Sequence, residues 1–305
     1  MAEISPTKPD AELVVFTDLD GTLLDHETYS FSPALEALDL LKSKGVPLIL
    51  CSSKTRAEIE LIQLDIGLRH PFISENGAAV FIPRGYFPLA PEATRGVEGY
   101  EVLECGIPYR QLVETLHRIS SELRIRVISF SDMSLDEVAR DSKLPPMEAR
   151  LAKLREYDEP FWILDSSAAT RSRLLNALRE AGLRCIRGGR YYHVTSVTDK
   201  GLAVRKLSSL YEQAWGNVLT VGLGDSPNDL PLLREVDIPI VVRNPAAGAA
   251  TRLLRKVPTA RISSAPGPRG WNETVLEVMR QRAGYTRRPP GNTSIWLEGI
   301  PMKRG

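Results

Sequence analysis

The sequence predicts an α/β protein with a doubly wound, Rossmann-like parallel sheet and an inserted α+β domain. Three observations support this fold class. Short apolar segments alternate with segments of helical length and periodicity in both the first and last parts of the chain. The middle of the chain interrupts this alternation. Two of the apolar segments end in pairs of aspartates, and the carboxyl ends of strands are where open α/β sheets bind ligands.

The first part of the chain predicts alternating strands and helices. A β-rich run begins at Leu13 and has no polar interruption, which is typical of a parallel strand covered on both faces. A helix is expected over 32–44, with Ser32 as its N-cap and Gly45 beyond its end. The other elements expected here are a strand at 46–52, a helix at 54–67 closed by Gly67, and strands at 71–77 and 78–83.

The middle of the chain has a different pattern. Between Tyr86 and His193, short helices such as 108–124 flank short strands such as 161–165. The regular alternation resumes at Asp199, so the core is expected to be discontinuous. The expected organisation is a flexible N-terminus at 1–12, a core domain at 13–85 and 194–283, an inserted domain at 86–193, and a flexible tail at 284–305.

Composition indicates a soluble globular protein. The 305 residues include 39 Lys and Arg against 38 Asp and Glu, for a net charge of +1, so no strong field favours nucleic acid or a membrane surface. No apolar run reaches transmembrane length, and we expect a cytoplasmic protein. Cys51, Cys105 and Cys185 lack the spacing of a zinc site or a disulfide framework. The oligomeric state is left open.

The first strand ends in two aspartates, Asp18 and Asp20, followed by Gly21. Two carboxylates this close disfavour each other's ionisation unless a cation or a shared proton intervenes. The alternative is a solvated Asp-Gly turn without chemical function.

A second acidic pair, Asp225 and Asp229, follows another apolar strand in the segment GLGDSPND. The carboxyl ends of parallel strands share one edge of a sheet, so we expect these residues beside Asp18 and Asp20. Four carboxylates form the oxygen-rich site that Mg²⁺ prefers. The alternative is a turn followed by an N-capped helix.

Two further segments can contact a phosphate. Ser52 follows the second strand and can donate a hydrogen bond to a phosphoryl oxygen, and Ser53 and Lys54 follow at a predicted helix N-terminus, where anions are favoured. Lys200 can place a positive charge against the same phosphate. The alternatives are that Ser53 only caps the helix and that Lys200 is solvated.

The segment DLDGT, the strand-end Ser52, Lys200 and GDSPND have the order of the four motifs of the haloacid dehalogenase-like phosphatases, which this chain resembles. The segments CSSKTRAE, SENGAAVFIP, REYDEPF, RGGRYYHV and GLGDSPNDLPLL are similar to the mannosyl-3-phosphoglycerate phosphatases of that superfamily. The similarity runs from Leu13 to the helix near Met279. It implies Mg²⁺-dependent hydrolysis of mannosyl-3-phosphoglycerate to phosphate and mannosylglycerate, a compatible solute.

The resemblance also implies roles for individual residues. Asp18 becomes the nucleophile that accepts the phosphoryl group, and Asp20 becomes the acid that protonates the leaving group and then the base that activates water. The implied ligands of Mg²⁺ are Asp18, the backbone carbonyl of Asp20, Asp225 and Asp229. The implied contacts of the phosphoryl group and its surroundings are Ser52, Lys200, Thr22 and Asn228.

The leaving group offers hydroxyls and a carboxylate, and arginine binds carboxylates through paired hydrogen bonds. Arg187 and Arg190 in the inserted domain are the expected partners. The other expected substrate contacts are Gly188, Gly189, His193, Glu75, Asn76, Ser53 and Lys54. The alternative for RGGRYY is a β-hairpin with solvated arginines. Arg155 is interpreted as part of a charged helix end.

Several alternatives remain. The substrate, a small phosphorylated glycoside, can instead be glucosyl-3-phosphoglycerate, sucrose phosphate or trehalose phosphate, or the chain can be a phosphomannomutase. A non-enzymatic alternative is a phospho-acceptor signalling module, since such modules also place aspartates at strand ends. Asp20 and the inserted domain argue against it, because a stable phospho-signal needs neither a proton shuttle nor a lid.

Overall fold

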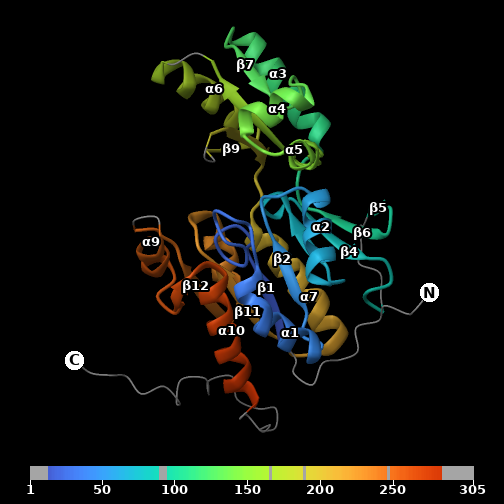
Figure 1. Cartoon of the computed structure of the whole chain (residues 1–305). Coiled ribbons are helices and arrows are strands. Elements are labelled where there is room, and N and C mark those ends of the chain that lie inside the picture. Colours follow the sequence, from blue (N-terminus) through green and yellow to red (C-terminus); the bar gives the residue numbers. More distant parts are fainter. Residues whose placement is uncertain (1–12, 89–94, 165–166, 188–189, 246–247, 284–305) are drawn as a thin grey trace.

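A computed structural model describes residues 13–88, 95–164, 167–187, 190–245 and 248–283 of the chain (Figure 1). The structure has two parts, each built around its own sheet, stacked one above the other in this view. The segments expected to be flexible ends, 1–12 and 284–305, lie outside the described residues. Within the described ranges, no helix has the length and apolar character needed to cross a membrane.

The larger part contains a nine-stranded sheet in the order β13-β12-β11-β1-β2-β3-β4-β6-β5. The run from β13 to β3 is parallel, and β4, β6 and β5 extend it as antiparallel strands. The predicted α/β class is confirmed, whereas the antiparallel extension was not predicted. The strands are β1 Leu13–Thr17, β2 Leu48–Cys51, β3 Phe72–Ser74, β4 Ala79–Pro83, β5 Arg95–Val97, β6 Tyr100–Glu104, β11 Leu219–Gly224, β12 Ile238–Arg243 and β13 Arg261–Pro266.

Helices cover both faces of this sheet, as expected for a doubly wound fold. Alternate residues of β1 point to opposite faces, so Leu13 and Val15 pack with α1, α2 and α10, whereas Val14 and Phe16 pack with α7, α8 and α9. Because both faces are buried, β1 is apolar throughout its first four residues. The helices are α1 Leu35–Ser43, α2 Arg56–Ile66, α7 Lys200–Trp215, α8 Leu230–Glu235, α9 Ala249–Lys256 and α10 Gly267–Ala283.

Two predicted helix starts are wrong. Ser32 is the first residue of a short 3₁₀ turn, η1 (Ser32–Ala34), and its hydroxyl accepts a hydrogen bond from Ser30 instead of capping a helix. The N-cap of α2 is Thr55, which forms a capping box with Glu58, so Ser53 lies before the cap. The threonine is favoured because Glu58, three residues later, accepts a hydrogen bond from the Thr55 backbone amide.

The smaller part contains a four-stranded antiparallel sheet in the order β7-β8-β10-β9. Strands β5 and β6 join the larger sheet, although they lie within the predicted inserted domain, 86–193. We therefore propose that the inserted domain, called the cap from here on, begins near Cys105 and ends near Ser196. Its elements are α3 Tyr109–Glu122, β7 Val127–Ser129, α4 Leu135–Ser142, α5 Pro146–Ala152, β8 Asp158–Ile163, α6 Ala168–Glu180, β9 Leu183–Arg187 and β10 Tyr192–Ser196.

The order of the strands determines where a site can form. From β1 the chain continues to β2 on one side, and the later strand β11 pairs with β1 on the other side. This reversal at β1 opens a crevice at the carboxyl ends of the strands. The cap lies above this edge of the sheet (Figure 1).

The turn after β3 is a point where the fold depends on one glycine. Gly77 has a φ of +94°, and a Cβ on it would lie 2.1 Å from the carbonyl oxygen of Asp199. Gly67 also has a positive φ, +76°, but has no heavy atom within 4 Å of that position. A side chain at Gly67 would therefore cause only backbone strain, whereas one at Gly77 would cause backbone strain and a steric clash.

We expect Gly67→Ala to lower the free energy of unfolding by about 1–2 kcal/mol, the cost of a left-handed alanine. Gly77→Ala should lower the free energy of unfolding by a further ~1–3 kcal/mol, because the backbone of Asp199 cannot move aside freely. Urea unfolding of both variants measures this difference. Equal losses would contradict the close packing of this turn against Asp199.

Candidate active site

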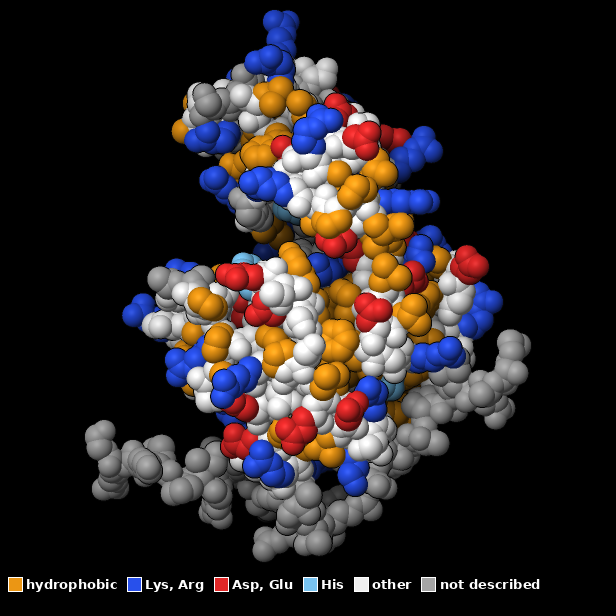
Figure 2. All heavy atoms as spheres, in the orientation of Figure 1, with side chains coloured by type: hydrophobic (Ala, Val, Ile, Leu, Met, Phe, Trp, Pro, Cys, Tyr) orange, Lys and Arg blue, Asp and Glu red, His pale blue; other side chains and the backbone are white. Residues whose placement is uncertain are grey.

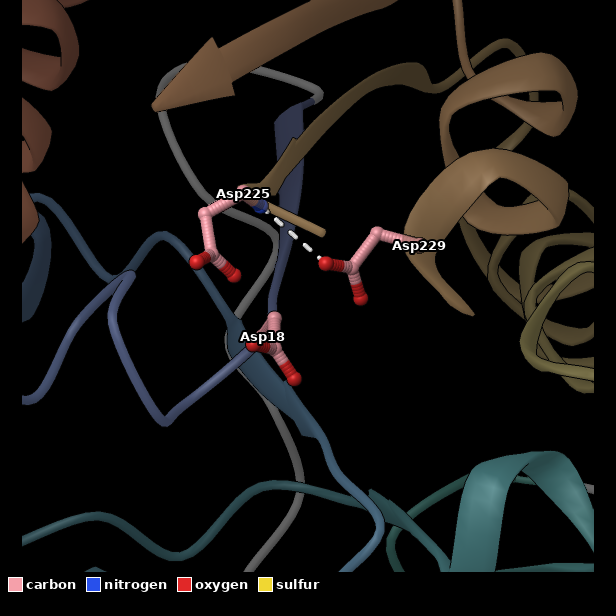
Figure 3. A group of neighbouring side chains, drawn as sticks. All are labelled: Asp18, Asp225 and Asp229. Carbon is pink, nitrogen blue, oxygen red and sulfur yellow. Dashed lines mark hydrogen bonds between the residues drawn. The ribbon is translucent and has the colours of Figure 1, made fainter. Parts of the chain in front are cut away.

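Three aspartate side chains converge at the carboxyl edge of the large sheet (Figure 3). Asp18 follows β1, Asp225 follows β11, and Asp229 ends the 3₁₀ turn η3 (Pro227–Asp229). One carboxylate oxygen from each lies within 4.8 Å of the others, and all three residues are buried. The pairing of β1 with β11 brings them together, because the Asp18 amide donates to the Leu223 carbonyl at 2.9 Å.

Lys200 connects two of these carboxylates. Its Nζ donates to Asp18 Oδ1 at 2.5 Å and to Asp229 Oδ1 at 2.7 Å, and its side chain has no exposed surface. Lys200 is the first residue of α7, whose N-cap Asp199 accepts a hydrogen bond from the Leu202 amide. The predicted alternative of a solvated lysine is therefore wrong.

Burial and mutual repulsion shape the electrostatics of this group. Burial raises the pKa of Asp18 well above its usual value, and Asp229 raises it further. Burial, followed by the charge of Asp229, raises the pKa of Asp225 to about 6. Burial lowers the pKa of Lys200, but Asp18 and Asp229 outweigh this effect and raise it above its usual value. Three ionised carboxylates and one ammonium leave a net charge of −2, which a divalent cation neutralises.

The orientation of Asp225 is controlled by two neighbours. Thr22 donates its hydroxyl to Asp225 Oδ1 at 3.2 Å, and Asn244 donates its side-chain amide to Asp225 Oδ2 at 2.5 Å. Gly21, with a φ of +80°, leaves room for this carboxylate, since a Cβ there would lie 2.7 Å from Asp225 Oδ2. Thr22, predicted as a substrate contact, thus orients Asp225. Asn244 follows β12 without an acidic motif, so the sequence analysis missed it.

The loop that carries Asp18 is also held by α10. Trp271, fully buried on α10, donates its indole N–H to Thr17 Oγ1 at 3.0 Å, and the Thr17 hydroxyl donates to the Asp18 carbonyl at 2.8 Å. A single sequence offers no signal for this pair, because it joins positions far apart in the chain.

Asp20 contacts the loop that follows β2. Lys54 Nζ lies 3.2 Å from Asp20 Oδ1 and 4.0 Å from Glu58 Oε1. Burial lowers the pKa of Lys54, but Asp20 and Glu58 raise it above its usual value. The buried Ser52 Oγ accepts a hydrogen bond from the Lys54 amide at 3.1 Å. The backbone carbonyl of Ser53 accepts a hydrogen bond from Arg155 of the cap at 2.9 Å.

Asn76 and Asn228 meet across the crevice, since Asn228 Nδ2 donates to Asn76 Oδ1 at 3.3 Å. Glu75, predicted to contact substrate hydroxyls, is buried, and its two carboxylate oxygens accept the backbone amides of Glu156 and Tyr157 at 2.9 Å each. Burial raises the pKa of Glu75 to about 8, and Arg155 opposes this shift. The carboxylate therefore joins the core to the cap, a role that the sequence analysis did not foresee.

The predicted cap contacts lie on the hairpin formed by β9 and β10. Arg187 and Arg190 are exposed; the Arg187 guanidinium lies 5.8 Å from the centre of the Tyr192 ring, and Arg190 donates to the Asp141 carbonyl. His193 Nδ1 lies 3.0 Å from an oxygen of the buried Asp158. The predicted contacts Gly188 and Gly189 lie outside the described residues.

The donor set fits a hard divalent cation. Asp18, Asp225 and Asp229 offer only oxygen ligands, they are buried, and Thr22 and Asn244 hold one of them in place. Such a cation favours the ionised forms of Asp18 and Asp225, whose pKa values burial otherwise raises. Asp18, Asp225 and Asp229 would hold the metal, and Asp18 is also the candidate nucleophile.

Comparison with known proteins identifies the family. The model of the haloacid dehalogenase-like hydrolases matches residues 15–86. A glucosyl-3-phosphoglycerate/mannosyl-3-phosphoglycerate phosphatase of Methanococcoides burtonii is 41% identical over 266 residues, which cover 87% of this chain and 97% of that protein. The chain belongs to the phosphatases of the haloacid dehalogenase-like hydrolase family. A phosphatase of the same description from Persephonella marina is 40% identical and covers 88% of this chain and 98% of its own length.

Solved structures share the fold of this phosphatase. A haloacid dehalogenase-like hydrolase from Bacteroides thetaiotaomicron has a TM-score of 0.62 at 16% identity, covering 87% of this chain and 99% of its own. A subclass IIB sugar phosphatase of the superfamily has a TM-score of 0.57 at 18% identity, covering 89% and 99%. As a haloacid dehalogenase-like phosphatase, the chain is a phosphoric monoester hydrolase, and this membership decides against the signalling-module alternative.

Metal binding to this phosphatase should depend on pH. Asp225 has a raised pKa of about 6 and must lose its proton to bind a cation, so a fall in pH below 6 should weaken Mg²⁺ binding. We expect a loss of about tenfold per pH unit for each proton released. Calorimetric titration with Mg²⁺ in buffers of different ionisation enthalpy measures both the affinity and the protons released. An affinity that is constant from about pH 5 to about pH 8 would contradict the raised pKa.

Proposed function

We propose that this phosphatase hydrolyses mannosyl-3-phosphoglycerate to mannosylglycerate and phosphate, with Mg²⁺ as its metal and through an aspartyl-phosphate. The observation that carries the chemistry is the buried Lys200, which bridges Asp18 and Asp229 beside Asp225 at the edge of the sheet. The names of the two relatives support the substrate class. Because both names include the glucosyl compound, glucosyl-3-phosphoglycerate is the second candidate.

In the first step, a carboxylate oxygen of Asp18 attacks phosphorus while the bond from phosphorus to the glycerate oxygen breaks. Asp20, two residues further along the same loop, donates its proton to the departing alkoxide. Lys200 already contacts Asp18, so its ammonium can stabilise charge on the transferring oxygens. The Ser52 hydroxyl, which accepts the Lys54 amide, has its proton available for a phosphoryl oxygen.

In the second step, water attacks phosphorus of the aspartyl-phosphate, the Asp18–phosphorus bond breaks, and Asp20 takes the proton from the water. Inorganic phosphate leaves and both aspartates return to their starting states. A bound Mg²⁺ would neutralise negative charge on the transferring group and on the carboxylates. Asp225 and Asp229 have no covalent role in this scheme, and their function is to hold the metal.

The leaving group is proposed to bind the cap. Arg187 and Arg190 place two exposed guanidinium groups on the β9–β10 hairpin, where a glycerate carboxylate can bind. His193 lies on the same hairpin, is held by Asp158 of β8, and offers its other ring nitrogen. We also propose that the enzyme works in the cytoplasm and needs no nucleic acid, in keeping with its net charge of +1.

A substrate panel tests the proposal. Phosphate release is measured for mannosyl- and glucosyl-3-phosphoglycerate, sucrose phosphate, trehalose phosphate and mannose phosphates, each with and without Mg²⁺. We expect kcat/KM for mannosyl-3-phosphoglycerate to exceed that for the disaccharide phosphates by at least about 100-fold, because only the glycerate ester presents a carboxylate to the arginines. A higher kcat/KM for any compound without glycerate, or activity independent of the metal, would contradict the proposal.

The proposed proton shuttle makes a separate prediction. Asp20→Asn cannot donate or accept the proton, so kcat/KM with the glycoside should fall by about 10²–10⁴-fold. An aryl phosphate has a better leaving group and needs less protonation, so its first step should fall less. Single-turnover measurements with both substrates separate the two steps.

The matched control is Asp39→Asn, since Asp39 is an exposed aspartate on α1 that pairs with Lys42. We expect this variant to keep the activity of the parent enzyme. If Asp20→Asn slowed the first step equally for the glycoside and the aryl phosphate, this would argue against acid catalysis by Asp20.

A further inference from the structure

The turn after β3 has an unusual backbone. Glu75 and Asn76 have φ angles of +45° and +58°, and Gly77 follows at +94°, so three consecutive residues lie in the left-handed region. This conformation is unfavourable for Glu and Asn and requires support from the surroundings. The Glu75 amide donates to the Lys54 carbonyl at 3.1 Å, and the Asn76 amide donates to the Ser52 carbonyl at 2.9 Å. The turn is therefore tied to the loop after β2.

The same turn contacts both connections between the core and the cap. On the way into the cap, the amides of Cys105 and Gly106 both donate to the Ala78 carbonyl at 2.8 Å. On the way back, the Thr198 hydroxyl donates to the Gly77 carbonyl at 3.1 Å, and Gly77 packs against the backbone of Asp199. Lys200 follows directly as the first residue of α7. The two connections between core and cap, together with the start of α7, thus contact residues 75–78.

The Glu75 side chain extends from this turn into the cap. Its Oε1 accepts the amide of Glu156 and its Oε2 accepts the amide of Tyr157, each at 2.9 Å, and the residue is 1% exposed. Burial raises the pKa of this carboxyl, and the positive charge of Arg155 opposes part of that effect. Two backbone amides of one peptide segment are matched by two acceptor oxygens, which a carboxylate provides and an amide side chain does not.

Further contacts fix the cap on the same side. Arg155 Nη1 donates to the Ser53 carbonyl at 2.9 Å, and the Thr55 hydroxyl donates to the Leu151 carbonyl at 3.0 Å. These bonds join α5 and the segment after it to the start of α2. Figure 2 shows the two parts of the molecule in contact on this side, whereas the surface is hollowed between them on the opposite side. The cap is thus held along one edge.

We propose that residues 75–78 are the pivot of the cap and that Glu75 is a positioning residue, which holds the segment 156–157 on this pivot rather than contacting the substrate. The pivot also contacts the loop of Ser52 and the start of α7, but these contacts involve its backbone and do not depend on the Glu75 side chain. The enzymatic part of this proposal rests on the proposed function, whereas its structural part does not.

Glu75→Gln is the decisive variant at a pH above the raised pKa of about 8, where Glu75 is ionised, because it keeps the size of the side chain but retains only one acceptor oxygen. One of the two cap amides then faces an NH₂ group and loses its hydrogen bond. Hydrogen exchange in the full chain without substrate follows the peptide 154–160, which contains both amides. We expect exchange at this peptide to be at least about tenfold faster than in the parent protein.

Kinetics provide the second readout. A cap that is held less firmly should lower kcat/KM for mannosyl-3-phosphoglycerate by about 10–100-fold, since misplacement of the leaving-group site slows the reaction. A small aryl phosphate does not use the cap contacts, so its kcat/KM should change by less than about threefold. The two effects together distinguish a positioning role from a general loss of structure.

Glu114→Gln is the matched control, because Glu114 is an exposed glutamate on the cap helix α3 that pairs with Arg110. It should change neither exchange at 154–160 nor activity. If Glu75→Gln does not fold, as judged by circular dichroism, Glu75→Asp replaces it. Asp keeps both acceptor oxygens but is one methylene shorter, so it should show the same direction of change in exchange.

Unchanged exchange at 154–160 in the folded Glu75 variant would overturn the proposal. Reduced turnover of the glycoside with unchanged exchange would also overturn it and would assign Glu75 to substrate binding. Should the substrate panel reject mannosyl-3-phosphoglycerate, the exchange experiment still decides the role of Glu75, because it uses no substrate.

Discussion

The active site depends on the burial of three carboxylates around one lysine. Asp18, Asp225 and Asp229 lie within 4.8 Å of one another, and only Lys200 supplies a positive charge inside this group among the described residues. Such a cluster carries an excess of negative charge that is unfavourable in a low-dielectric interior, and a bound divalent cation would neutralise it. The surrounding structure holds the cluster in place: β1 and β11 align the strand ends, Thr22 orients Asp225, and α7 presents its first residue.

The core and the cap have different proposed roles. The core carries the groups proposed for phosphoryl transfer, which are the same for any phosphate ester. The cap carries the exposed arginines proposed to select the leaving group. Selection and chemistry can act together only if the cap is held at a defined position above the sheet edge. The turn at 75–78 links these tasks, because its backbone contacts the core loops and Glu75 binds the cap.

The sequence was sufficient to predict the α/β class and the meeting of three of the four strand-end aspartates, because parallel strands share one edge and buried strands are apolar. The fourth, Asp20, pairs with Lys54. It was not sufficient for contacts that join distant positions, such as Trp271 with Thr17 and Asn244 with Asp225. The antiparallel strands β5 and β6 were assigned to the inserted domain, since strand partners are not encoded locally. Glu75 was predicted as a substrate contact because its actual partners, two backbone amides that donate to its carboxylate, leave no pattern in the sequence.

The central claim is that Asp18 carries the phosphoryl group during turnover. Enzyme mixed with substrate is quenched within one turnover and treated with borohydride, which reduces an acyl phosphate to an alcohol and converts aspartate into homoserine. Mass spectrometry of the digested protein then locates the change. We predict homoserine at position 18 only, and none when Asp18→Asn is treated in the same way. Homoserine at position 20, 225 or 229, or turnover without any covalent intermediate, would contradict the account.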